Sequence, residues 1–247
     1  NGENLDENME FARVSMDLAL SRGGDQVVIK DNENYQFFGG HAKEGNRNSR
    51  VRARVKAYAL TELIEDASNV IIMGHRYTDL DCMGAGIGVY SIVSALDKKC
   101  KIVLNEVTSS VSYLYDRIIK DEKYKDTFIS SEQALKLVNR KTLLIIVDVY
   151  KQGLCECPEL IDKVKKIVVF DHHRKGVDYI ENAVLTYHEP YASSTCELIT
   201  EMLMYVNKPI PIKQVEADSI LAGIIVDTKN FAFKTGIKTF EAAAFLK

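Results

Sequence analysis

The chain has 247 residues, enough for one large domain or two smaller ones with a buried core. Hydrophobic residues make up 46% and charged residues 27%, as in an ordinary globular protein, and the net charge of −3 argues against broad capture of duplex nucleic acid. Five cysteines without a repeated spacing form a poor disulfide framework and are typical of a reducing, cytoplasmic compartment.

Residues 1–45 predict the C-terminal part of an α+β domain followed by a linker. Apolar residues between Met9 and Ala19 have helical spacing, and short strands are expected at 27–30 and 35–38. Residues 39–49 are polar, contain glycine and lack a period, which indicates a linker. Since about 40 residues are too few to bury a core alone, we interpret this segment as the end of a longer domain.

From residue 46 to 247 strands and helices alternate, which predicts an α/β domain with a mostly parallel sheet flanked by helices. Strands are expected at 70–73, 101–104, 143–147, 167–170 and 184–187, and helices at 51–63, 83–96, 132–138, 193–205, 215–226 and 239–247. The apolar runs are too short to cross a membrane, so we expect no membrane contact within this chain. The chain lacks an initial Met and stops inside an expected helix, so we interpret it as a fragment of a longer protein.

Acidic and imidazole residues follow three of the expected strands. His75 follows the strand at 70–73, Asp148 ends the one at 143–147, and Asp171-His172-His173 follows the one at 167–170. In parallel sheets, ligands bind beyond the carboxyl ends of the strands. We therefore expect these side chains to gather at one edge of the sheet.

Six residues form the metal site that this arrangement predicts: His75, Asp79, Asp81, Asp148, His172 and Asp227. Carboxylates and imidazoles without thiolates suit paired divalent cations such as Mn²⁺, and Cys82 is expected to point away. Two such cations could hold a bridging hydroxide and stabilise an in-line phosphoryl displacement, with Asp148 shared between them. Gly84, Gly86 and Gly88 are expected to let the following helix pack closely on the sheet.

Each part of this site also has a simpler interpretation. Asp79 and Asp81 could cap a helix, and Asp148 could be an ordinary loop residue. The adjacent histidines could lie on the surface, and Asp227 could pair with Lys229 at a helix end.

The order of these residues resembles a known family. The segment His75-x-x-x-Asp79-x-Asp81, then Asp148, Asp171-His172-His173 and Asp227, resembles the four motifs of the DHH phosphoesterase superfamily. Residues 69–75, 189–195 and 226–231 resemble the GdpP/YybT-type cyclic-di-AMP phosphodiesterases. Arg22-Gly23-Gly24-Asp25-Gln26 is similar to the end of that family's degenerate GGDEF domain. The resemblance thus divides the chain into a GGDEF-like tail with linker at 1–45 and a DHH domain at 46–247.

The resemblance implies hydrolysis of cyclic-di-AMP to linear pApA by two-metal activation of a bridging hydroxide. One Mn²⁺ would be held by His75, Asp79 and Asp148, and the other by Asp81, Asp148, His172 and Asp227. His173 and Arg174 would lie near the scissile phosphate. Ser193, Ser194 and Thr195 would contact a phosphate at a helix start, with plain helix capping as the alternative.

Two departures qualify what the resemblance implies. Tyr150 stands where relatives commonly show His, and the family's C-terminal DHH-associated domain is not part of this sequence. Full-length relatives carry transmembrane helices, so we expect this chain to be the cytoplasmic domain of a protein anchored in the cell membrane.

The alternatives to a cyclic-di-AMP phosphodiesterase are a DHH oligonucleotide exonuclease, a pyrophosphatase, or a non-catalytic nucleotide-sensing module. The base preference, the native metal and a homodimeric state are left open.

Overall fold

The computed structural model describes residues 4–21, 26–31, 34–39, 45–174, 176 and 178–247. The chain divides into two units, residues 1–51 and 52–247. Residues 22–25 of the GGDEF-like segment lie outside the described part. The assignment of residues 1–45 to such a domain therefore stays a prediction.

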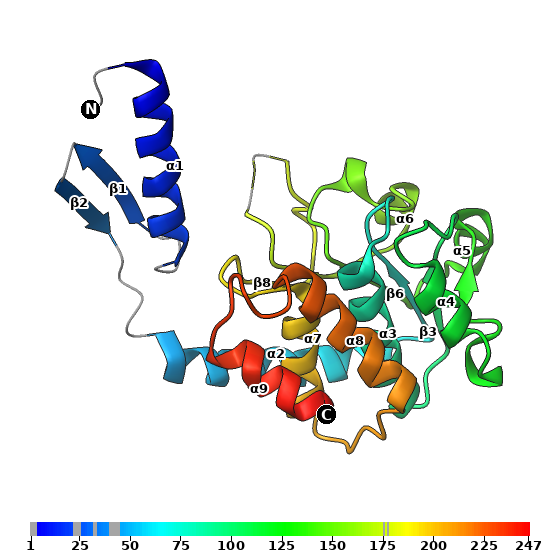
Figure 1. The fold of residues 1–247 in the computed structure, drawn as a ribbon. Helices are drawn as coiled ribbons and strands as arrows, with labels where there is room; N and C mark the ends of the chain where they lie inside the picture. Colours follow the sequence, from blue (N-terminus) through cyan, green and yellow to red (C-terminus); the bar gives the residue numbers. More distant parts are fainter. Residues whose placement is uncertain (1–3, 22–25, 32–33, 40–44, 175, 177) are drawn as a thin grey trace. The chain divides into compact units, whose positions relative to one another are not determined.

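In its described residues, the first unit contains one helix, one antiparallel strand pair and the start of a second, long helix, α2 (Gly45–Asp66). Helix α1 (Leu5–Ser21) is followed by β1 (Gln26–Asp31) and β2 (Asn34–Gly39), which pair antiparallel with Val28 opposite Phe37 (Figure 1). This agrees with the helix and strands expected there.

The predicted linker at 39–49 is wrong in its second half. Helix α2 (Gly45–Asp66) begins within that stretch, six residues before the helix start that we predicted, while residues 40–44 lie outside the described part. After Gly45 the segment contains neither Gly nor Pro, and Arg is a good helix former. High polarity was therefore mistaken for absence of structure.

The second unit is built on a six-stranded sheet in which every neighbouring pair is parallel. Its strands are β3 (Asn69–Met73), β4 (Cys100–Val103), β5 (Phe128–Ile129), β6 (Thr142–Val147), β7 (Lys166–Asp171) and β8 (Leu185–His188). The order β5-β4-β3-β6-β7-β8 shows that the chain runs outward from β3 to β5 and then returns to pair β6 with β3. The strand order reverses between β3 and β6, which is where open α/β sheets bind ligands.

Helices cover both faces of this sheet (Figure 1). They are α2, α3 (Leu80–Ala95), α4 (Ser112–Ile118), α5 (Ser131–Leu137), α6 (Glu159–Lys163), α7 (Thr195–Tyr205), α8 (Gln214–Asp227) and α9 (Ile237–Leu246). The predicted α/β fold is confirmed. β5, α4 and α6 were not predicted, because a period is hard to detect in elements this short, although α5, also of seven residues, was predicted at 132–138.

Two apolar cores lie on opposite faces of the sheet. In β6, Leu143, Ile145 and Val147 join the core beneath α2, α3, α7 and α8. Leu144 and Ile146 join the core on the side of α5 and α6. Both faces of the strand are buried, which explains its continuous apolar run. Among the described helices, none combines the length and apolar character that a bilayer span requires.

The glycines of α3 serve helix packing more than sheet packing. A Cβ at Gly84 would lie 2.5 Å from the backbone oxygen of Ser219 in α8, and one at Gly88 would lie 2.6 Å from Ile199 in α7. Only Gly86 faces the sheet, where the nearest atoms would be 3.9 Å away. The expectation that all three let α3 approach the sheet was therefore wrong for Gly84 and Gly88, which let it approach α7 and α8.

Substitution of these glycines tests that packing. Gly84→Ala should lower the free energy of unfolding by about 1–3 kcal/mol, because its Cβ would press on the backbone of α8. Gly86→Ala gives the same gain in helix propensity without a clash, and should leave stability unchanged or raise it by up to ~1 kcal/mol. Urea unfolding followed by circular dichroism measures both. Equal effects of the two substitutions would contradict the assigned helix contact.

Candidate metal centre

The strand-end loops of β3 and β6 bring His75 and Asp148 together at the reversal point of the sheet. Asp148 follows β6 directly, and its φ of 61° lies in the left-handed region that non-glycine residues rarely adopt. Its backbone N–H donates a hydrogen bond to the carbonyl of Phe170 in β7, at 2.8 Å. Strained backbone of this kind persists where the surrounding structure holds it, often at functional sites.

The first group of potential ligands surrounds His75. Its Nε2 lies 3.6 Å from Asp79 Oδ1 and 3.5 Å from Asp148 Oδ2. These separations are long for hydrogen bonds. Two atoms that are each about 2.1 Å from a common ion lie roughly 3.0–4.2 Å apart, so the separations suit shared coordination. Asp79 also accepts a hydrogen bond from the N–H of Cys82 at 2.9 Å, so helix capping applies to it as well.

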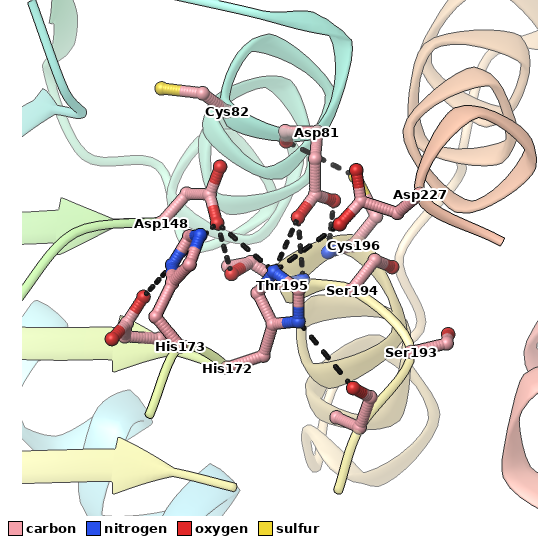
Figure 2. A network of polar contacts seen from close by, with 12 residues as sticks. Asp81, Cys82, Asp148, His172, His173, Ser193, Ser194, Thr195, Cys196 and Asp227 are labelled. Carbon is pink, nitrogen blue, oxygen red and sulfur yellow. Dashed lines mark hydrogen bonds and ion pairs between the residues drawn. The ribbon is translucent and has the colours of Figure 1, made fainter. Parts of the chain in front are cut away.

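The second group surrounds His172 (Figure 2). Its Nε2 lies 3.7 Å from Asp81 Oδ2, 3.6 Å from Asp148 Oδ1 and 3.3 Å from Asp227 Oδ2. Its Nδ1 lies 3.4 Å from the carbonyl of Ala192 and can donate to it, which leaves the Nε2 lone pair facing the carboxylates. The two oxygens of Asp148 therefore face two different histidines.

The three carboxylates of the second group raise an electrostatic problem. Asp81 and Asp148 are buried, and Asp227 is partly buried. Burial and the neighbouring Asp148 and Asp227 hold the pKa of Asp81 well above its ordinary value. Clustered carboxylates are costly unless protonated or bound to a cation. Together with the imidazoles, this donor set fits paired divalent cations.

Asp81 does not cap its own helix. It accepts hydrogen bonds from the N–H groups of Thr195 at 2.7 Å and Cys196 at 2.8 Å. These are orphan donors at the start of α7, where a negative charge is favourable. Asp81 thus links the first turn of α3 to the start of α7.

Cys82 corrects one expectation. We expected its side chain to point away, but its Sγ belongs to a group with ligand atoms of His75 and Asp148, all within 4.8 Å of one another. Asp79 and Cys82 are three residues apart at the start of α3, so both side chains lie on the helix face that is turned toward His75. Burial raises the pKa of the Cys82 thiol to about 11, so it is neutral near pH 7.

The hydroxyl groups at the start of α7 have partners within the protein. Ser193 donates to Glu197 at 2.6 Å, Ser194 accepts from the N–H of Glu197 at 3.0 Å, and Thr195 donates to Asp148 at 2.9 Å. The capping alternative therefore describes Ser194. Substrate contact by the three residues stays a prediction.

His173 and Arg174 lie at the rim of the site. His173 is half exposed, its Nδ1 lies 3.7 Å from Asp148, and it donates to Asp171 Oδ1 at 2.8 Å. The pKa of His173 is raised by this hydrogen bond, against the effect of burial. We did not assign a role to Asp171, although residues two apart in an extended chain point to the same side. Arg174 lines a cavity next to His173.

Comparisons with known proteins bear on the family and the fold of this chain. The family model described as "DHH family, N-terminal domain" matches residues 69–224. The chain is 47% identical over 246 residues to the cyclic-di-AMP phosphodiesterase GdpP of Bacillus subtilis (strain 168), covering 98% of this chain and 37% of that protein. It is 40% identical over 248 residues to the cyclic-di-AMP phosphodiesterase PdeA of Listeria monocytogenes serotype 1/2a (strain 10403S), covering 99% and 38%. The chain thus spans little more than a third of the length of these relatives.

One solved structure supports the fold. The exopolyphosphatase-related protein from Bacteroides fragilis matches with a TM-score of 0.65 at 19% identity, covering 78% of this chain and 56% of that one.

Loss of Asp148 should affect both groups of ligands at once. Asp148→Asn should weaken Mn²⁺ binding at two subsites by more than about tenfold, because each would lose an anionic oxygen. Asp79→Asn should affect only the subsite around His75. Mn²⁺ content after equilibrium dialysis measures both, with Asp116→Asn on the exposed face of α4 as control. Two retained Mn²⁺ ions in Asp148→Asn would remove this residue from the shared position.

Proposed function

This chain belongs to the DHH family, and on that premise we propose that it is a metal-dependent phosphodiesterase that hydrolyses cyclic-di-AMP to linear pApA. The observation that carries the proposal is Asp148, whose Oδ2 and Oδ1 face His75 and His172 respectively. The identity to two cyclic-di-AMP phosphodiesterases supports the substrate.

The ligand sets follow from the two groups of side chains. We assign His75, Asp79 and Asp148 to one cation and Asp81, Asp148, His172 and Asp227 to the other. When bound there, two divalent cations of the Mn²⁺ type would supply Lewis acidity toward water and phosphoryl oxygens. The burial of Asp81 and Asp148 keeps bulk water from their oxygens and strengthens their electrostatic interactions.

We assign the interaction with the reacting phosphate to His173. Asp171 is fully buried and accepts the Nδ1–H of His173, so the ring is fixed and Nε2 is left for substrate. When both ring nitrogens carry a proton, the state that the raised pKa of His173 favours, its Nε2 can donate a hydrogen bond to a phosphoryl or leaving-group oxygen. Arg174 adds a positive charge next to it.

The proposal extends to the longer protein. On family grounds, we place this chain on the cytoplasmic side of a membrane-anchored protein whose further segments complete substrate binding. An oligonucleotide exonuclease, a pyrophosphatase and a nucleotide sensor remain the competing functions.

The substrate assignment is tested by parallel turnover assays. With Mn²⁺, the protein should open cyclic-di-AMP to pApA faster than it cleaves pApA or pyrophosphate, and a chelator should abolish the reaction. Chromatography of the products measures all three rates. Preferred cleavage of pyrophosphate or pApA would overturn the assignment. Nucleotide binding without turnover in a chain that includes the downstream segments would identify a sensor.

Replacement of His173 tests its role. His173→Gln should lower kcat by about 10²–10⁴-fold, because a positioned proton donor is lost. The Mn²⁺ content should change far less than in Asp148→Asn. Asp171→Asn should give a smaller loss of kcat, because the ring is then oriented less well. If His173→Gln lost Mn²⁺ as completely as Asp148→Asn, the residue would be a ligand instead.

A further inference from the structure

A cavity of about 480 Å³ opens beside the candidate metal centre. Its walls come from the loops after β3, β6 and β7, and His75, Asp148 and His173 form the side next to the centre. The volume falls in the range of roughly 300–1,000 Å³ that is usual for small-molecule sites. The cavity is therefore large enough for a substantial part of a nucleotide.

Three cationic side chains line this cavity: Arg76, Lys151 and Arg174. Among the described residues, no carboxylate forms an ion pair with any of the three, whereas Asp148, which also lines the cavity, faces histidines. Lys151 lies over the ring of Tyr150, with 5.7 Å from Nζ to the ring centroid. A group of positive side chains without carboxylate partners in the protein is suited to bind an anionic ligand.

The walls of the cavity are held by backbone contacts. The Tyr150 hydroxyl accepts a hydrogen bond from the N–H of Gly176 at 3.0 Å, and its carbonyl accepts one from Ile180 at 3.0 Å. Across the cavity, the N–H of Arg76 donates to the carbonyl of Leu154 at 2.9 Å. The cationic side chains thus extend from loops that are tied to their neighbours, which lowers the cost of ordering them on binding.

A cyclic dinucleotide has two phosphates, and only one of them can react at a single metal centre. The other half of the molecule must lie alongside. We propose that this cavity binds the non-reacting half, with Arg76 and Lys151 on its phosphate and the ring of Tyr77 or Tyr150 against its base. Arg suits bidentate phosphate contacts, and aromatic rings stack on any base. This inference rests on the proposed function, and it gives Tyr150, which departs from the family pattern, a place in the wall of the cavity.

Equilibrium binding of linear pApA tests the assignment. Isothermal titration of the whole chain with pApA and Mn²⁺ is repeated over a series of salt concentrations, and chromatography confirms that the ligand stays intact. Arg76→Gln and Lys151→Gln should each raise Kd by roughly 5–150-fold. Each should also reduce the slope of log Kd against log salt, because one contact between a cation and a phosphate is lost. Lys151→Arg should retain the slope, and Lys165→Gln, at an exposed position outside the cavity, serves as control.

The outcomes separate this inference from the proposed function. Unchanged Kd and slope in Arg76→Gln and Lys151→Gln, with cyclic-di-AMP still hydrolysed, would overturn the cavity assignment alone. A reduced slope in Lys151→Arg as large as in Lys151→Gln would also overturn it. Charge-dependent binding of pApA by a chain that does not hydrolyse cyclic-di-AMP would overturn the proposed function and support the cavity as a nucleotide site.

Discussion

The second unit is organised around the mutual repulsion of carboxylates. Asp81, Asp148 and Asp227 come from three distant segments and meet around His172, where the burial of Asp81 and Asp148 limits the screening of their charges by water. Such a group is stable only if something positive or a hydrogen-bond donor faces each oxygen. The imidazoles, the start of α7 and the proposed cations supply these partners. The parallel sheet provides the rigid edge from which the three segments extend.

The sequence was most informative where one physical signal dominated. β6 and β7 were recognised because a strand buried on both faces must be apolar throughout. The candidate site was predicted because polar residues such as His75 and Asp148 lie just beyond the ends of such strands. The geometry then placed them as two groups around a shared carboxylate, although their identity as ligands stays a prediction.

Other features depend on contacts that a single sequence does not encode locally. The contact of Gly84 with α8 involves residues more than a hundred positions apart. The cavity joins Arg76, Lys151 and Arg174 from three loops, and each alone resembles an ordinary surface cation. The start of α2 was missed for the opposite reason, because its polar local sequence is compatible with both a linker and an exposed helix.

The same side chains connect the site to the fold. Asp81 holds the first N–H groups of α7, and Thr195 of that helix donates to Asp148. A cation that binds these carboxylates would therefore also stabilise the docked position of α7. Metal binding and folding would then be thermodynamically coupled. In a cell, the supply of divalent cations would then govern how much of the protein is present as well as how fast it works. When metal is scarce, proteolytic cleavage around the start of this helix should be the first effect to appear.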